Sequence, residues 1–322
     1  MKEKFIRTIF AIILALLMLN LAGCKSTYET NTQTEIKTIK IAYIPLTHAV
    51  PLYIQNELLK QNPQDVKLEL VKFSSWPEVI EALNAGKVDG ASILIQLAMK
   101  AREQGIDLKA VALGHRDGNV VVTSKYITSV AELKGKTFAI PHRLSTHNIL
   151  LYIMLKNNGL SYNDINVIEL PPPEMPAALS EGRISGYSVA EPFGAVSVAN
   201  GKGKVLFNSQ DLWGNSVCCA LVLRNDFIQN NRSIAEKFVQ EYVKAAHKAD
   251  SKDRATLDIL TKYLRTDSRV LELSLKWISY KNLKLEEKDY NDLSKYLVEM
   301  GLIENPPPYS DFVDNTLIDN AK

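Results

Sequence analysis

Two turns of the chain carry side chains that suit the binding of a small ligand. Thr47 and His48 follow an Ile-Pro pair, and Ser145, Thr146 and His147 follow a second Ile-Pro pair further along the chain. In both places a Leu-Tyr-Ile triplet comes next, within a segment that has helical spacing. Hydroxyl and imidazole groups at a helix N-terminus lie beside free backbone N–H groups, which favour an anion. Each turn is therefore predicted to contact a small anionic solute.

Further polar or aromatic side chains stand at the ends of predicted strands. They are Ser75, Trp76 and Gln96 in the first half of the chain, and His142, Arg143, Glu191 and Phe193 in the second half. Each also has a structural explanation, because hydroxyl groups cap helices, indoles pack at lobe edges, and Arg or Glu side chains pair in solvent. His115 lies at the first predicted crossing between the lobes and is expected only at the edge of the hinge there.

Sequence motifs of catalysis and of metal binding are weak. The chain has no Walker loop, no Gly-x-Gly-x-x-Gly, no His-Glu-x-x-His and no Cys-x-x-Cys, and residues 186–190 lack the last glycine of a nucleophile elbow. Cys218 and Cys219 are adjacent and have no potential ligands near them, so they are predicted to be small buried strand residues. No enzymatic activity, cofactor or metal site is expected.

Short aliphatic runs alternate with amphipathic stretches from residue 39 onward, which indicates α/β lobes with largely parallel sheets. The predicted strands cover residues 39–44, 66–73, 88–95, 109–113, 120–123, 136–140, 167–170 and 217–223, and the predicted helices between them cover 50–60, 77–85, 96–104 and 148–156. A Ser-x-x-Glu capping pattern at 233–236 opens a helical region with further segments at 253–265, 268–282 and 285–300. These last helices are predicted to cover the first lobe without contacting ligand.

The two halves of the chain repeat each other. Residues 76–90 align with residues 172–186 at an offset of 96, with one Pro, one Glu, one Ala, one Leu and two Gly identical. The Ile-Pro pairs share this offset, but the Thr-His pairs are 99 residues apart, so the second turn holds three extra residues. Two lobes of one topology would place these turns on opposite walls of a cleft. The extra segment with His142 and Arg143 is predicted to select the solute.

The N-terminus has the features of an export signal. Three basic residues precede an apolar run at 9–19, which is too short for a bilayer core of roughly 30 Å, and Leu-Ala-Gly-Cys follows. The segment resembles a bacterial lipoprotein signal, which implies that Cys24 becomes a lipid anchor. The predicted organisation is a signal peptide at 1–23, a flexible tether at 24–38, lobe 1 at 39–121, lobe 2 at 122–216, and a return to lobe 1 with C-terminal helices at 217–322.

Charge and composition exclude some classes of partner. Without residues 1–23 the chain has 35 basic and 35 acidic side chains, which argues against a nucleic-acid-binding surface. An apolar content of 46% supports a sizeable core in two lobes. We expect a monomer whose contact with the membrane is through the lipid.

The motifs together resemble the nitrate/sulfonate/taurine group of ABC-transporter solute-binding proteins. The resemblance rests on the lipoprotein signal, the Ser75-Trp76 turn and the Ala-Leu-Asn-Ala-Gly-Lys-Val-Asp-Gly-Ala block at 82–91. Thr146-His147, Glu-Pro-Phe at 191–193 and the Cys pair are similar to the nitrate- and bicarbonate-binding branch, although Phe193 stands where that branch has Trp. The likeness implies a type II periplasmic-binding fold of two α/β lobes and places Trp76, Gln96, Thr146, His147 and Glu191 in the pocket.

The expected function is capture of a small anion, of the nitrate, bicarbonate, sulfonate or taurine class, by closure of two lobes outside the cytoplasm. A permease and an ATPase subunit are the implied protein partners. A rival hypothesis is an uncharged heterocycle, such as a pyrimidine vitamin precursor, stacked on Trp76 and Phe193. A rival of another class is an extracytoplasmic enzyme that uses His48 or His147 with Glu191 as a base.

Overall fold

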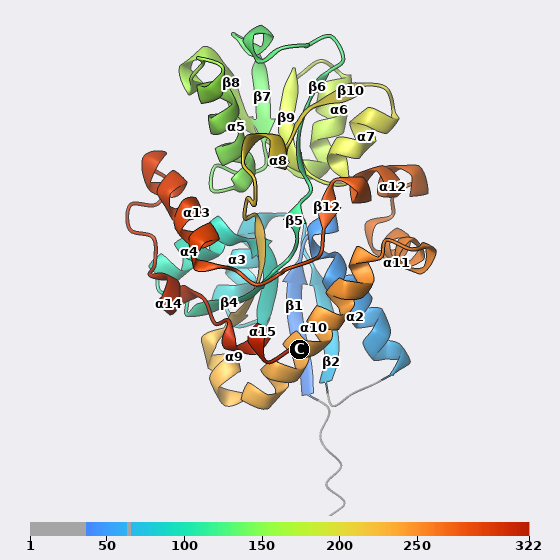
Figure 1. Ribbon diagram of the computed structural model, residues 1–322, viewed down its shortest axis with the longest axis vertical. Helices are drawn as coiled ribbons and strands as arrows, with labels where there is room; N and C mark the ends of the chain where they lie inside the picture. The colour runs from blue at the N-terminus through green and yellow to red at the C-terminus, as the bar shows by residue number, and fades with distance from the viewer. Residues whose placement is uncertain (1–36, 63–65, 322) are drawn as a thin grey trace, which may run out of the picture. The chain divides into compact units, whose positions relative to one another are not determined.

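The computed structural model describes residues 37–62 and 66–321 and contains two five-stranded sheets (Figure 1). The predicted signal peptide and Cys24 lie outside the described residues. The first sheet has the order β2-β1-β3-β11-β4, with strands Lys37–Tyr43 (β1), Val66–Lys72 (β2), Gly90–Leu94 (β3), Leu108–Leu113 (β4) and Cys219–Arg224 (β11). The second has the order β10-β6-β9-β7-β8, with strands Asn119–Ser124 (β6), Thr137–Ile140 (β7), Asn166–Glu169 (β8), Gly186–Ala190 (β9) and Gly203–Asn208 (β10).

The two sheets have the same topology, as the internal repeat predicted. In each lobe the three strands of the internal repeat are parallel, with the first of the three in the middle, as β2-β1-β3 and β8-β7-β9. An antiparallel strand then lies beside the third one, β11 in the first lobe and β6 in the second. Because β11 comes from the far side of the second lobe in the sequence, the second lobe is an insertion within the first.

Helices and 3-10 turns connect the strands of both lobes. In the first lobe they are the 3-10 turn η1 (Thr47–Ala49) with α2 (Val50–Gln61), α3 (Trp76–Asn84) and α4 (Ile95–Glu103). In the second lobe they are η2 (Val130–Leu133), α5 (Thr146–Asn157), η3 (Tyr162–Asp164), η4 (Pro172–Glu174) with α6 (Met175–Ser180), α7 (Phe193–Ala199) and α8 (Ser209–Leu212). The predicted elements of the repeat are therefore confirmed to within a few residues.

The C-terminal region differs from its prediction in two places. It comprises α9 (Asn225–Asn230), α10 (Arg232–Asp250), α11 (Arg254–Leu264), α12 (Ser268–Lys276), α13 (Glu287–Glu299), α14 (Tyr309–Phe312) and α15 (Thr316–Asp319). Ser233 lies inside α10 and not at its N-cap, which is Asn231. The predicted helix at 268–282 ends at Lys276, because the next residues form β12 (Ile278–Ser279) and pair with β5 (Arg116–Asp117).

The C-terminal helices also contact both lobes, which corrects the prediction that they cover the first lobe alone. Helix α12 packs against α7 of the second lobe, and Trp277 packs on the core of that lobe. Glu299 of α13 accepts hydrogen bonds from Tyr152 and Lys156 of α5. In Figure 1 these segments lie beside the junction of the two sheets. The C-terminal region therefore ties the lobes together.

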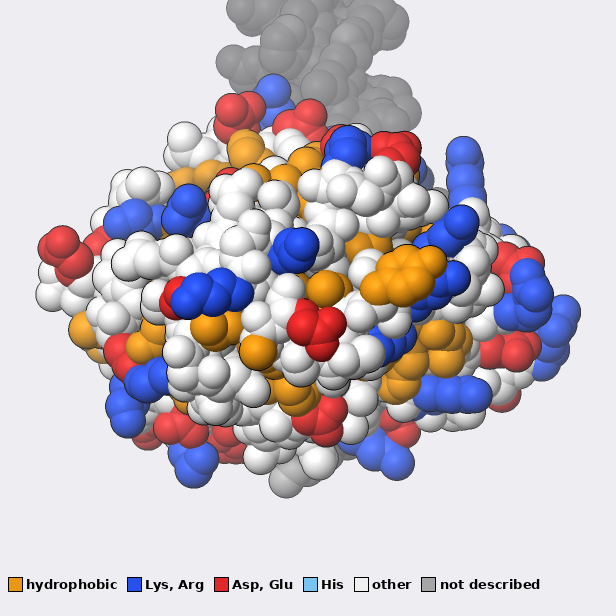
Figure 2. All heavy atoms as spheres, turned by 90° about the horizontal axis from the view of Figure 1, so that it is seen from above, with side chains coloured by type: hydrophobic (Ala, Val, Ile, Leu, Met, Phe, Trp, Pro, Cys, Tyr) orange, Lys and Arg blue, Asp and Glu red, His pale blue; other side chains and the backbone are white. Residues whose placement is uncertain are grey.

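The chain crosses between the lobes a little earlier than predicted. Strand β6 from Asn119 already belongs to the second sheet, whereas the predicted boundary lay after residue 121. The crossing therefore lies at 114–118, which includes His115 and β5. Basic and acidic side chains are interspersed on the face seen from above in Figure 2, in line with the balanced charge of the sequence.

Candidate functional site

The two matched turns meet between the lobes. Thr47 and His48 form η1 directly after β1, and Thr146 and His147 open α5 after β7. All four side chains are at most 2% exposed. The rings of His48 and His147 are parallel, with centroids 6.3 Å apart. The prediction that the turns face each other is confirmed, but they are buried at a closed interface and do not line an open cleft.

Hydrogen bonds join the two lobes around these turns. The backbone carbonyl of Glu191 accepts bonds from the backbone N–H and the hydroxyl of Thr47, at 3.0 and 2.9 Å. Gln96 Nε2 donates to Thr146 Oγ1 at 2.6 Å, and that hydroxyl donates to the carbonyl of Val217 at 2.5 Å. Four of the predicted site residues therefore form direct contacts that hold the lobes together.

The two cysteines lie beside His48, which the sequence analysis missed. His48 Nδ1 is 3.3 Å from Cys219 Sγ and 3.8 Å from Cys218 Sγ, and the two sulfurs are 3.9 Å apart. Both thiols are buried, as predicted. The premise that they have no ligands nearby was wrong, because β11 returns to the first lobe and brings residues 171 positions apart into contact.

His115 is part of the same group, although the sequence placed it only at a hinge edge. Its ring stacks on that of His48 with centroids 3.5 Å apart, and its Nδ1 lies 2.6 Å from the carbonyl of Asp117. His48, His115, Cys218 and Cys219 have one potential ligand atom each within 4.8 Å of one another. We refer to these four residues together with His147 as the His-Cys cluster.

Burial controls the protonation of the His-Cys cluster. Burial, with the neighbouring imidazoles, lowers the pKa of His115 and of His147 to about 4, so both rings are neutral at pH 7. Burial opposes ionisation of both thiols and raises the pKa of Cys219. For Cys218 the hydrogen bond with Cys219 and the adjacent imidazoles outweigh burial and lower the pKa. The pKa of the Cys218 thiol is therefore lower than that of the Cys219 thiol.

Several buried polar atoms around the cluster have no hydrogen-bond partner among the described residues. Both ring nitrogens of His147, Nε2 of His115, Oε1 of Gln96, Nδ2 of Asn119 and Oε1 of Glu191 belong to this group. Buried polar groups normally find partners, and several orphans gathered in one place indicate a ligand site. None of these residues is Lys or Arg, so no permanent positive charge is among them.

Glu191 follows β9 directly and is fully buried. Its Oε2 accepts a hydrogen bond from Ala195 N at 2.9 Å and lies 3.2 Å from the hydroxyl of Ser274 on α12. Burial raises its pKa to about 8, and the two hydrogen bonds only partly offset that effect. The side chain therefore caps α7 and contacts the C-terminal region, while its carbonyl contacts Thr47.

The structure does not bring the other predicted residues into the cluster. The side chain of Arg143 is 66% exposed, with Nε 4.0 Å from Glu169, and Nδ1 of His142 accepts a bond from Leu144 N. In the extra segment Arg143 is therefore exposed, whereas His142 is partly buried and bonds within its own turn. Ser145 caps α5, and its hydroxyl bonds to its own turn.

Ser75, Trp76 and Phe193 each have a structural role in capping or packing. Ser75 is the N-cap of α3 and forms a capping box with Glu78. Trp76 is 4% exposed within the core of the first lobe, and Phe193 packs, partly buried, against the cores of both lobes. Both side chains thus pack on the cores, and Nε1 of Trp76 is buried without a hydrogen-bond partner among the described residues. A contact of either side chain with a solute stays a prediction.

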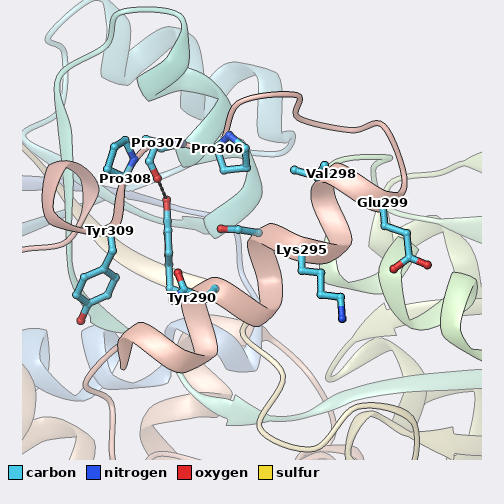
Figure 3. Close-up of a pocket in the computed structure, with 10 residues that line it drawn as sticks. Tyr290, Lys295, Val298, Glu299, Pro306, Pro307, Pro308 and Tyr309 are labelled. Carbon is cyan, nitrogen blue, oxygen red and sulfur yellow. Dashed lines mark hydrogen bonds between the residues drawn. The ribbon is translucent and has the colours of Figure 1, made fainter.

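A surface pocket elsewhere does not belong to the cluster. It has a volume of about 680 Å³ and is lined by α13 and the proline run 306–308, with Tyr290 donating to the carbonyl of Pro307 (Figure 3). None of the cluster residues lines it. Within the described residues, no helix is long and apolar enough to cross a membrane.

Two α/β lobes of matching topology, with a buried polar site at their junction, define the two-lobed periplasmic-binding fold. The sequence matches the model of the NMT1-like family over residues 32–263, more than half of its length. The chain therefore belongs to the NMT1-like family. Its match covers between 34% and 63% of the first four curated relatives.

Three individual proteins show what the chain is similar to. The ligand-binding component of an ABC-type import system from Staphylococcus aureus, whose crystal structure has zinc bound, is 42% identical with a TM-score of 0.85, over 89% of this chain and 99% of that one. A putative aliphatic sulfonates-binding protein of Bacillus subtilis is 26% identical over 96% of both chains. The nitrate-binding protein NrtA from Synechocystis, at 19% identity and TM-score 0.78 over 89% of this chain and 88% of that one, shares the fold.

Proposed function

We propose that this protein is the extracytoplasmic solute-binding component of an ABC importer. The main observation is the buried meeting of two matched turns, one from each lobe, around polar atoms that have no partners. In this proposal an open form admits the solute and a closed form is recognised by the permease. The contacts of Thr47 with Glu191 and of Gln96 with Thr146 would form on closure. The membership of the NMT1-like family supports this role.

The relatives give the starting panel of solutes. They include proteins named for nitrate or nitrite, taurine and aliphatic sulfonates, in agreement with the small anion predicted from the sequence. Anchoring through Cys24 and partnership with a permease and an ATPase belong to the same proposal. No chemical step is proposed, so the solute should be recovered unchanged after binding, whereas the rival enzymatic hypothesis predicts turnover.

Isothermal titration with nitrate, bicarbonate, taurine, alkanesulfonates, a pyrimidine precursor and divalent metal ions tests the proposal. We expect one saturable solute at a ratio of one per chain, with a decrease in radius of gyration by X-ray scattering on binding. Absence of any saturable solute, or turnover of a bound one, would contradict the transport role. Affinity for the uncharged pyrimidine alone would support the stacked-heterocycle alternative.

A further inference from the structure

Three ligand atoms of the His-Cys cluster already have the spacing of a metal site. Tetrahedral Zn²⁺ binds sulfur at about 2.3 Å and nitrogen at about 2.0 Å, so two sulfurs should be about 3.8 Å apart, and a sulfur and a nitrogen about 3.5 Å. The two sulfurs of Cys218 and Cys219 are 3.9 Å apart. His48 Nδ1 lies 3.8 Å from the sulfur of Cys218 and 3.3 Å from that of Cys219. These three atoms occupy three corners of such a tetrahedron.

Hydrogen bonds on the far side of two rings prepare them for coordination. His48 Nε2 lies 3.3 Å from the carbonyl of Gly118, and His115 Nδ1 lies 2.6 Å from the carbonyl of Asp117. A carbonyl can only accept, so each of these nitrogens is the one that carries the N–H when the ring acts as a ligand. The lone pair is then on His48 Nδ1 and on His115 Nε2. Metal-bound histidines normally have this arrangement, with the second ring N–H donated to a carbonyl.

His115 supplies the fourth ligand, and His147 closes the site. His115 Nε2 has no hydrogen-bond partner among the described residues. One ring nitrogen of His115 lies within 4.8 Å of a potential ligand atom of each of the other three residues. A tilt of its ring away from that of His48 would direct the lone pair toward the same point. His147 is 2% exposed with both nitrogens unpartnered, and it comes from the second lobe. It therefore covers a site that the first lobe and the crossings build.

Charge balance favours a cation over an anion here. A buried ion needs compensation, and none of the cluster residues is Lys or Arg. A small anion would bring an unpaired negative charge into a buried site where none of the cluster residues carries a permanent positive charge. A divalent ion that displaces one proton from each thiol leaves a neutral unit of one metal and two thiolates. Thiolate and imidazole ligands select Zn²⁺ over Mg²⁺ or Ca²⁺.

We propose that His48, His115, Cys218 and Cys219 bind one thiophilic divalent metal ion, for which Zn²⁺ fits best, and that this ion is the solute on which the lobes close. The inference rests on the proposed transport function and names its solute class. The four ligand side chains are buried, so the ion enters only when the second lobe and His147 move away. Binding would then be coupled to closure.

Cobalt titration of the reduced, metal-free full chain tests the site directly. We expect one Co²⁺ per chain, a thiolate-to-cobalt charge-transfer band, visible bands typical of tetrahedral coordination, and displacement by one Zn²⁺. Cys218→Ser and Cys219→Ser should each weaken the charge-transfer band, and these variants and His48→Gln should each lower Zn²⁺ affinity by roughly tenfold or more. His247→Gln, on an exposed face of α10, is the matched control and should bind as the wild type does.

Scattering and anion titration on the same samples separate the possible failures. Compaction upon addition of Zn²⁺ is expected and supports the ion as solute. Zn²⁺ binding without compaction, or a cobalt spectrum unchanged by both cysteine variants, overturns the inference. Saturable binding of nitrate or a sulfonate by the metal-free chain, with no metal binding, overturns the metal site but leaves the transport function standing. If a cysteine variant is unfolded by circular dichroism, His115→Gln gives the same comparison.

Discussion

At the scale of residues, His48 contacts two segments of the chain that are far from it in the sequence. Its ring contacts a thiol of the returning strand, the carbonyl of Gly118 in the crossing, and the stacked ring of His115. The sequence identified His48 and His147 from their repeated positions. It could not identify the cysteines as their neighbours, because that contact depends on how 171 intervening residues fold. Arg143 was selected for its charge, yet its charge is best solvated at the surface, where the structure places it.

Glu191 should make stability depend on pH. Its pKa is about 8 in the folded protein and near 4.5 in the unfolded chain, so the folded state holds a proton that the unfolded state loses. The free energy of unfolding therefore falls as pH rises from 4.5 to 8. Glutamine does not titrate, so the free energy of unfolding of Glu191→Gln lacks this pH dependence. Relative to wild type, it should therefore rise between pH 5 and pH 8 by on the order of 3 kcal/mol.

Urea unfolding at both pH values measures this difference. Glu304→Gln, at an exposed position, is the control and should leave the pH dependence unchanged. An equal stability difference at pH 5 and pH 8 for Glu191→Gln would mean that the carboxyl is ionised in the fold.

Thr146→Val tests the hydrogen bonds that join the lobes. The change removes the acceptor for Gln96 Nε2 and the donor to Val217, at nearly constant volume. Because these bonds exist only when the lobes meet, we expect solute affinity to fall by about 1 to 3 kcal/mol with a smaller effect on unfolding. Calorimetric titration measures the affinity. Thr261→Val on the exposed side of α11 is the control. Equal solute affinities for the two variants would mean that the hydrogen bonds of Thr146 do not contribute to closure of the lobes.

At the scale of elements, local patterns predicted the repeat well and the C-terminal region less well. The strands and helices of both lobes follow hydrophobic periodicity, which a sequence displays directly. The Ser-x-x-Glu pattern at 233–236 is local too, but α10 already begins at Arg232, with Asn231 as its N-cap, so Ser233 lies inside the helix. The end of α12 is set by the pairing of β12 with β5, about 160 residues away in the chain. No local pattern contains that information.

Gly118 in the first crossing is an element-scale test. Its φ is +79°, and an added Cβ would lie 2.7 Å from Ile278 of β12. Gly105 has φ +96° but open space around it, so it isolates the cost of the backbone conformation. We expect Gly105→Ala to cost roughly 1 kcal/mol and Gly118→Ala roughly 2 kcal/mol more, with weaker solute binding only in the second case. Equal unfolding free energies for both variants would show that β12 yields to the new methyl group.

At the scale of the whole molecule, the proposed lipid anchor determines where binding takes place. Cys24→Ala should abolish lipid attachment and move the protein from the membrane fraction to the soluble exported fraction, with solute affinity unchanged. Detergent phase partition and metabolic labelling with a fatty acid measure the two properties. Labelling that persists in Cys24→Ala would contradict the anchor, and Cys218→Ser in the same assay controls for acylation of another thiol.

The insertion of the second lobe within the first has a consequence for the order of folding. Every strand of the second sheet comes from residues 119–208, so that lobe can complete its sheet from one contiguous stretch. The first sheet lacks the strand between β3 and β4 until residues 219–224 arrive. During synthesis the first sheet therefore stays incomplete until the whole second lobe has been made. Until then the edges of β3 and β4 that later pair with β11 are unpaired. Strand β11 contains Cys219 and directly follows Cys218. The His-Cys cluster is therefore assembled in the same late step that completes the first sheet.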